Sequence, residues 1–115
     1  MILGTHHIAI IVSSEASIEF YSRLGFCETW RKDRGYDVVV LMEGNGIELE
    51  IFISPTHPAR ATDPETMGVR HFALKVSNIE EATQQFKCGP IMKDWQGERF
   101  CFTWDPDGLP IELHE

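Results

Sequence analysis

The two halves of the chain carry the same pattern of residues. The stretch THHIAIIV (residues 5–12) reappears as VRHFALKV (residues 69–76), and its second histidine and its alanine return at a constant offset of 64 residues. Near the end of each half, NGIELE (residues 45–50) matches DGLPIE (residues 107–112) at an offset of 62 residues. The two offsets differ by one short deletion. An internal duplication of this kind predicts two copies of one structural module.

The alternation of apolar and polar residues predicts the elements of each module. In the first half we expect a strand, a helix and three strands, over residues 5–12, 13–26, 26–32, 36–42 and 47–53. The second half repeats this order, over residues 69–76, 77–86, 90–95, 98–104 and 109–115. The sequence therefore predicts an α+β fold, with two tandem βαβββ modules in a single domain, residues 1–115. Module one is residues 1–53, module two is residues 69–115, and the Pro-rich, aperiodic residues 54–68 are a linker.

Charge and composition exclude several classes of partner. The chain has 115 residues, a formal net charge of −8 and a pI of about 5.0. Nucleic-acid binding needs a basic face, so we expect no nucleic-acid partner. No apolar run approaches the ~20 residues that cross a bilayer, and the start MILGTHH does not resemble a signal peptide. We expect a cytoplasmic protein without membrane partners. Three cysteines, none in a Cys-x-x-Cys pair, argue against a disulfide framework or a thiolate zinc site.

Four of the predicted strands place a histidine or a glutamate on the face that turns away from the helix. His7 and His71 stand there in the first strand of each module, and Glu50 and Glu112 in the last, with Glu48 beside Glu50. Such a face is either solvent surface or the lining of a cavity. Enclosed carboxylates are costly unless a cation neutralises them, and imidazole with carboxylate suits Zn, Ni, Mn, Fe or Co. Two interpretations stay open: one bound divalent metal ion, or unrelated surface charges.

Five stretches, taken in order, resemble the vicinal oxygen chelate superfamily, the glyoxalase I and bleomycin-resistance group: HHIAIIV, FYSRLGF, IELEIF, GVRHFALKV and DPDGLPIELHE. The resemblance covers essentially the whole chain. It is closest to small, single-domain lactoylglutathione lyase-like proteins. It implies that the two modules form a curved, barrel-like mixed sheet around a metal cavity, with the helices outside. It also implies a homodimer.

The resemblance implies four ligands for one divalent metal ion, which are His7, Glu50, His71 and Glu112. The internal repeat favours Glu50 over its neighbour Glu48, because Glu48 falls opposite Pro110 when the halves are aligned. It likewise favours the second histidine of the pair over His6. The metal set therefore takes one histidine and one glutamate from each module.

The resemblance also implies an activity, which is proton transfer next to a carbonyl by a lactoylglutathione lyase-like carbon–sulfur lyase. The metal ion would hold two adjacent oxygens of a small-molecule substrate, while a glutamate moves the proton between neighbouring carbons. Glu112 is the first candidate for this base and Glu50 the second. The expected substrate is the hemithioacetal of a 2-oxoaldehyde and a thiol. An epimerase, a thiol transferase and a non-catalytic drug- or metabolite-binding protein remain alternatives.

Other polar and aromatic residues have separate expectations. His6 is expected to be structural, His57 to lie on the surface, and His114 to stand near the cavity mouth without binding metal. Three cations are expected on the surface and could meet an anionic substrate: Arg70, Lys75 and Arg99. The three tryptophans are expected to pack in the core, with a place in the lining of a pocket as the alternative: Trp30, Trp95 and Trp104.

Overall fold

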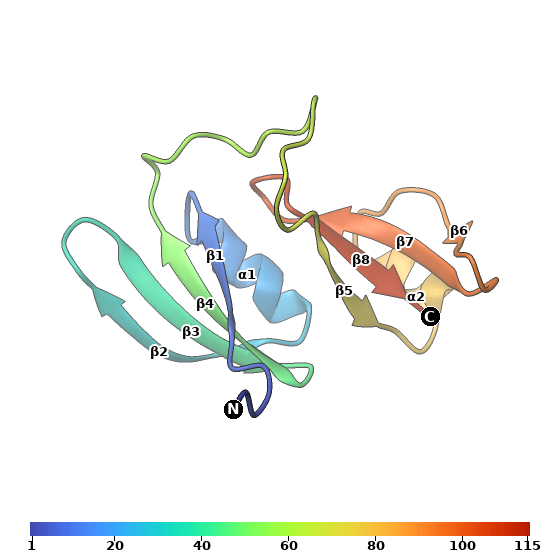
Figure 1. Ribbon diagram of the computed structural model, residues 1–115, viewed down its shortest axis with the longest axis horizontal. Helices are drawn as coiled ribbons and strands as arrows, with labels where there is room; N and C mark the ends of the chain where they lie inside the picture. The colour runs from blue at the N-terminus through green and yellow to red at the C-terminus, as the bar shows by residue number, and fades with distance from the viewer. The chain divides into compact units, whose positions relative to one another are not determined.

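The computed structural model describes all 115 residues, which divide into two compact units, Met1–Ala59 (unit 1) and Arg60–Glu115 (unit 2). Each unit has one helix and four strands (Figure 1). Unit 1 contains β1 (Ile8–Val12), α1 (Ala16–Arg23), β2 (Cys27–Asp33), β3 (Val38–Gly44) and β4 (Ile47–Ile53). Unit 2 contains β5 (Phe72–Lys75), α2 (Ile79–Gln85), β6 (Met92–Lys93), β7 (Arg99–Trp104) and β8 (Pro110–His114).

The strands form two four-stranded mixed sheets with the same topology. Their orders are β1-β4-β3-β2 and β5-β8-β7-β6. β1 runs parallel to its neighbour β4, and β5 runs parallel to its neighbour β8. All other neighbouring strands are antiparallel. The predicted α+β fold of two βαβββ modules is thus confirmed, with curved sheets and no closed barrel.

The register of the parallel pairs is the same in both units. Ala9 of β1 lies opposite Glu50 of β4, and Ala73 of β5 lies opposite Glu112 of β8. In both units the histidine comes two residues before this alanine, just ahead of the strand. Because side chains alternate along a strand, the histidine and the glutamate are directed to the same face.

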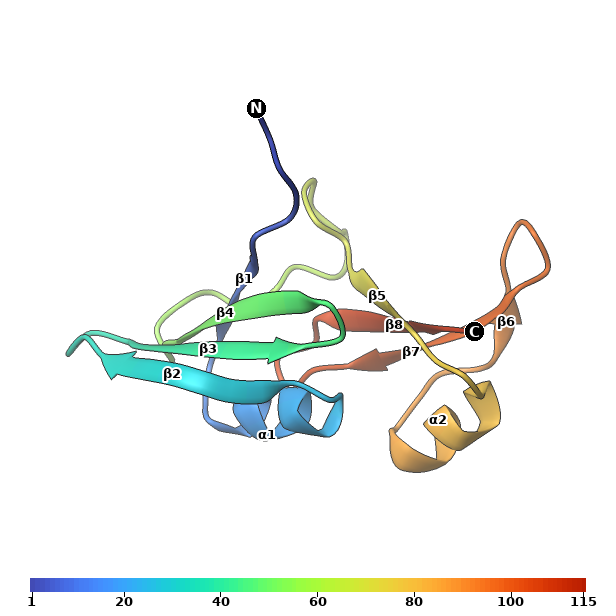
Figure 2. The ribbon, with the colours of Figure 1, turned by 90° about the horizontal axis from the view of Figure 1, so that it is seen from below.

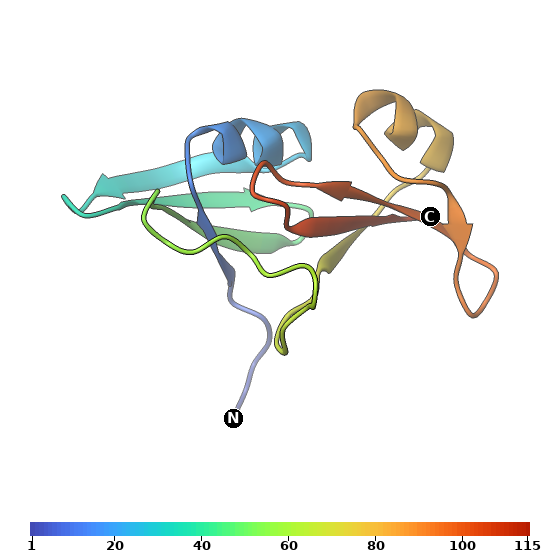
Figure 3. The same cartoon turned by 90° about the horizontal axis from the view of Figure 1, so that it is seen from above.

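The other face of each sheet is apolar and is covered by the helix of its own unit. Figure 2 shows α1 lying along one face of its sheet, and Figure 3 shows α2 on one face of the second sheet. The buried strand residues on this face are Ile10, Val12, Val40, Met42, Leu49, Ile51, Leu74, Cys101, Thr103, Ile111 and Leu113. Burial of one such aliphatic side chain stabilises the fold by about 1.5–3 kcal/mol. This packing leaves the opposite face free for the polar residues.

Side-chain hydrogen bonds before the helices and a tight turn between two strands define where these elements begin and end. The Ser14 hydroxyl accepts a hydrogen bond from the Ala16 amide at 3.3 Å before α1, and the Asn78 side chain accepts one from the Glu81 amide at 3.0 Å before α2. Asn45 and Gly46, with φ of 52° and 78°, make the two-residue turn between β3 and β4. Such a turn requires positive φ at both positions. It fixes the register that brings Glu50 beside Leu41.

The tryptophan prediction is wrong, because none of the three lies in the core. Trp30, Trp95 and Trp104 are 49%, 103% and 46% exposed. Trp30 stands on β2, an outer strand whose residues are all exposed, and Trp95 lies in the turn after β6. A large aromatic ring at the rim of a small sheet has no second layer to cover it. Neither helix is long and apolar enough to cross a membrane.

The segment predicted as a linker divides between the two units. Residues 54–59 belong to unit 1, and residues 60–68 to unit 2. The latter part is joined by a bridge between Thr62 and Glu65. The assignment of residues 54–68 to a linker between modules stays a prediction, but part of this segment contributes to the site described next.

Candidate metal and substrate site

The first predicted pair of ligands lies together in unit 1. His7 Nε2 is 3.8 Å from Glu50 Oε1, and the two side chains are 38% and 30% exposed. The pair forms because His7 precedes β1 and Glu50 stands in β4, its parallel neighbour. Ala9 carries only a methyl group opposite Glu50, so the carboxylate stays accessible.

The second predicted pair lies together in unit 2 and is more enclosed. His71 Nε2 is 3.5 Å from Glu112 Oε1, and the side chains are 24% and 17% exposed. The ring of Phe102 meets the His71 ring edge to face, with centroids 5.0 Å apart. Phe102 also pairs with Glu112 across β7 and β8. The aromatic ring therefore fixes the imidazole and shields the carboxylate.

The four predicted ligands thus form two pairs, one in each unit, and no group of three or more metal-ligating side chains is assembled. The donor set of each pair suits a divalent ion. A nitrogen and an oxygen that bind one ion at about 2.1 Å each lie about 3–3.5 Å apart at bond angles of about 90–110°. The His71–Glu112 separation is within this range, and the His7–Glu50 separation exceeds it by a few tenths of an ångström.

The rival residues in unit 1 form a pair of their own. His6 Nδ1 lies 4.0 Å from Glu48 Oε2 and 2.8 Å from His7 Nδ1. His6 is exposed, and the expectation that it is structural stays a prediction. Because the contact with His7 uses Nδ1, the Nε2 atom of His7 remains directed to Glu50. Unit 2 has no counterpart of this second pair, since Arg70 and Pro110 occupy the aligned positions.

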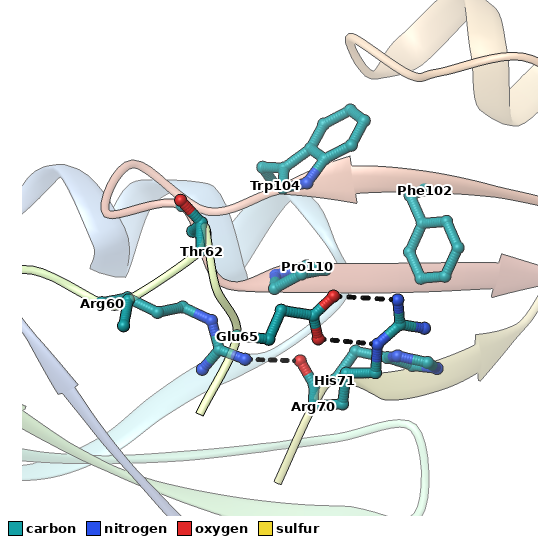
Figure 4. Close-up of a pocket in the computed structure, with 10 residues that line it drawn as sticks. Arg60, Thr62, Glu65, Arg70, His71, Phe102, Trp104 and Pro110 are labelled. Carbon is teal, nitrogen blue, oxygen red and sulfur yellow. Dashed lines mark hydrogen bonds and ion pairs between the residues drawn. The ribbon is translucent and has the colours of Figure 1, made fainter. Parts of the chain in front are cut away.

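A pocket of about 420 Å³ opens beside His71, entirely within unit 2 (Figure 4). It is lined by Arg60, Ala61, Thr62, Glu65, Arg70, His71, Phe102, Trp104, Gly108 and Pro110. In Figure 4 the ring of Phe102 and that of Trp104 come from β7, while the charged residues come from the segment before β5. The pocket therefore combines an apolar wall with a charged rim, as small-molecule sites commonly do.

The charged rim is ordered by its own contacts. Arg70 donates two hydrogen bonds to the carboxylate of Glu65, at 2.8 and 3.0 Å, and these hold the pKa of Glu65 below its ordinary value. Arg60 donates from Nη2 to the backbone carbonyls of Arg70 and Val69, at 2.7 and 3.3 Å. The two arginines and one glutamate leave a formal charge of +1 at this rim, in a chain whose net charge is −8.

His114 has a structural role near the end of β8. Its Nε2 lies 2.9 Å from Asp94 Oδ2, and its ring stacks on Phe100 with an interplanar angle of 8°. The hydrogen bond with Asp94, followed by that with the Glu115 carbonyl, raises the pKa of His114. His114 does not line the pocket. The expectation that it binds no metal stays a prediction, and His57 is exposed as expected.

Only one of the three candidate cations lines the pocket. Arg70 does so, Lys75 is exposed on β5, and Arg99 is occupied by two carboxylates. Arg99 donates hydrogen bonds to Glu80 and to Glu115, and these contacts lower the pKa of both carboxyls. Arg99 thereby ties α2 to the end of the chain.

This cluster predicts an acid-sensitive contribution to stability. A carboxyl whose pKa is lowered in the folded state stabilises the protein above its unfolded-state pKa, here 4.5, and loses that contribution as the pH falls through the folded-state value. In urea titrations between pH 6 and pH 3, Arg99→Gln should therefore show a smaller loss of stability on acidification than the native protein. Lys87→Gln, an exposed control with the same change in charge, should follow the native curve. Parallel curves for all three proteins would contradict this prediction.

Sequence reasoning missed Arg60, Thr62, Glu65 and Phe102 as pocket residues. Three of them lie in the segment assigned to a linker, where the absence of periodicity removes any indication of which side chains face inward. Phe102 could have been predicted as a pocket residue from the alternation of side chains along the strand. It lies on the same face as Phe100, opposite the buried Cys101 and Thr103. Trp104, at the end of the same strand, lines the pocket rather than the core.

Comparison with known proteins places the chain in a family. Residues 4–113 match the model of the Glyoxalase/Bleomycin resistance protein/Dioxygenase superfamily. The YwkD protein of Bacillus subtilis (strain 168) is 40% identical over an alignment of 127 residues, which covers 100% of this chain and 98% of YwkD. Superfamily members typically bind a divalent metal ion, bind small molecules and often act as dimers.

Solved structures share the fold over almost the whole chain. A glyoxalase family protein from Enterococcus faecalis is 40% identical, covers 98% of each chain and has a TM-score of 0.90. The fosfomycin resistance protein FosX from Listeria monocytogenes is 20% identical, with a TM-score of 0.79 over 99% of this chain and 94% of FosX, and its likeness is one of fold. The family match over residues 4–113, the identities near 40% and the repeated His–Glu register agree, and the chain belongs to the Glyoxalase/Bleomycin resistance protein/Dioxygenase superfamily.

Proposed function

We propose that this protein is a metal-dependent lyase or isomerase of the glyoxalase I type. One divalent ion, among Zn, Ni, Mn, Fe and Co, is held by His7, Glu50, His71 and Glu112. The observation that carries the proposal is the repeated pair: each unit sets one imidazole nitrogen 3.5–3.8 Å from one carboxylate oxygen, on strands in identical register. Two carboxylates and two neutral imidazoles carry a charge of −2, which a divalent cation cancels.

The chemistry follows from what these groups can do. A bound divalent ion supplies a Lewis acid for two neighbouring oxygens of the substrate, which is most simply the hemithioacetal of a 2-oxoaldehyde and a thiol. Glu112 acts as the base: one carboxylate oxygen accepts the proton from the carbon next to the carbonyl and returns it to the neighbouring carbon. Glu50 is the second candidate for this base. Phe102 limits the access of water to Glu112, since it pairs with that residue across the strands.

We further propose that the protein acts in the cytoplasm as a homodimer, the assembly common in its superfamily. Light scattering on the purified protein tests the dimer.

The test of the metal set is elemental analysis after loading with Zn, Ni, Mn or Co and gel filtration. We expect close to one ion per chain in the native protein. His7→Ala and His71→Ala should each lose it, because each removes a ligand from a single shared ion. His57→Ala, which removes an exposed histidine outside the pairs, should keep it. Two ions per chain, with one retained in each variant, would show that the pairs bind separately and would overturn the single-ion proposal.

A second function is a small-molecule binding protein without turnover. The observation that favours it is the pocket of unit 2, which is open to ligands whether or not an ion is bound. If the native protein takes up no divalent ion under any loading condition, the lyase proposal fails and this second function takes its place.

A further inference from the structure

The pocket of unit 2 adjoins the proposed metal site and is lined mainly by residues that are not proposed metal ligands. His71 is the one proposed ligand among its lining residues, and the other nine do not belong to the proposed ligand set. A molecule bound at His71 and Glu112 therefore has the pocket directly beside it. The lining residues determine what the rest of that molecule can be.

The rim of the pocket contains a positively charged residue, Arg60, with hydrogen-bond donors that have no partner. Both hydrogen bonds of Arg60 start from Nη2 and end on backbone carbonyls, which are neutral. Its Nε and Nη1 groups have no hydrogen-bond partner, so three of its five N–H donors are free. Arg70 differs, because its guanidinium is already paired with the Glu65 carboxylate. Arg60 is close enough to Glu65 to help lower the pKa of that carboxyl, but its hydrogen bonds go only to backbone carbonyls. Arg60 is thus the group at this rim whose remaining donors can receive an oxyanion.

The opposite wall is aromatic. Figure 4 shows the rings of Phe102 and Trp104 on the side of the pocket across from Arg60, with Pro110 between them and the rim. Trp104 is 46% exposed, so part of its indole ring is available to a ligand in the pocket. Phe102 is fixed by its edge contact with His71. This wall suits a flat apolar group.

We propose that the pocket selects small organic anions in which a flat apolar group carries a carboxylate or a similar oxyanion. The oxyanion is bound by Arg60, and the flat group lies against Phe102 and Trp104. The inference rests on the proposed function only in placing the reacting end of the molecule at His71 and Glu112. The anion subsite itself requires no metal. The positive rim in an otherwise acidic chain also attracts such anions from solution.

The subsite is tested first on metal-free protein, prepared by dialysis against a chelator. Benzoate and benzyl alcohol are matched probes that differ in charge, and isothermal titration calorimetry measures their affinities. We expect benzoate to bind more tightly, by about tenfold, because a charge-assisted hydrogen bond is gained. This preference should shrink as ionic strength rises. Equal affinity for the two probes in the native protein would overturn the proposal without any variant.

Variants then assign the residue. Arg60→Gln should remove the preference for benzoate, Arg60→Lys should keep part of it, and Lys87→Gln, outside the pocket, should leave it unchanged. Circular dichroism checks that each variant is folded. A folded Arg60→Gln protein that still prefers benzoate would overturn the assignment. If Arg60→Gln does not fold, the assignment is decided by the benzoate preference of Arg60→Lys and by the salt dependence of this preference in the native protein.

A second pair of probes separates this inference from the proposed function. Benzohydroxamate and 3-carboxybenzohydroxamate both chelate divalent ions, and only the second carries the carboxylate. On zinc-loaded protein the carboxylated probe should bind about tenfold more tightly, and Arg60→Gln should abolish the difference. If zinc improves neither affinity while benzoate still depends on Arg60, the metal proposal fails and the anion subsite stands. If zinc improves the affinity of both probes but the native protein binds the two probes equally tightly, the metal proposal stands and the anion subsite fails.

Discussion

Glu112→Gln is expected to lower turnover by about 10²–10⁴-fold while the protein still binds a divalent ion. Glutamine keeps the shape of the side chain and one oxygen donor, but its amide cannot accept the proton from carbon. The measurement is exchange of the substrate's carbon-bound hydrogen in deuterium oxide, followed by NMR on the hemithioacetal of a 2-oxoaldehyde and glutathione. This signal reports proton transfer directly, even when product release is slow.

Glu48→Gln is the matched control for this experiment. Glu48 lies on β4 with Glu50 and faces the same way, and its replacement changes the charge equally. It should leave both exchange and metal content unchanged. A Glu112→Gln protein that binds metal and still exchanges hydrogen at the native rate would contradict the role of Glu112, and Glu50→Gln would then be examined as the base.

Divalent metal is expected to stabilise the native protein against unfolding, and Glu50→Ala is expected to remove that effect. A ligand that binds only the folded state stabilises it by an amount that grows with concentration, about 2.7 kcal/mol at 100 times its dissociation constant. Differential scanning calorimetry with and without zinc should therefore show a rise in melting temperature for the native protein. Glu50→Ala should melt at the same temperature in both conditions.

The control here is again the neighbouring glutamate. Glu48→Ala should keep the zinc-dependent rise, because Glu48 has no counterpart in the second half of the chain, where Pro110 stands. The reverse result, with the rise lost in Glu48→Ala and kept in Glu50→Ala, would show that the ion is bound by His6 and Glu48. The experiment thus decides between the two His–Glu pairs of unit 1.

Sequence alone predicted the fold, and particular residues show why, whereas the set of four ligands around one ion stays a prediction. Once the duplication sets the alignment, the period of two along a strand places Glu50 and Glu112 on the face away from the helix, and the parallel register brings each beside its histidine. The direction of a side chain can therefore be predicted from the sequence wherever it follows from the period of two along a strand.

The pocket could not be predicted in the same way. Arg60 and Glu65 lie in a segment without periodicity, so the direction of their side chains depends on particular contacts, such as that of Arg60 with the carbonyl of Arg70. Core packing was preferred to pocket lining for Trp104, but this residue stands at the end of β7, where no second layer covers it, and it lines the pocket. Loop conformation and the edges of a sheet are decided by tertiary contacts.

The duplication has a consequence for how the protein can change. The His–Ala–Glu register is present twice, whereas the pocket lies within unit 2 and takes part of its lining from residues 60–65. Substitutions in that segment can alter which molecules are accepted without disturbing any strand pairing. Under the proposed function, such an arrangement separates the four proposed ligands from an adjustable recognition surface, and it makes new substrate preferences accessible through a few changes in one loop.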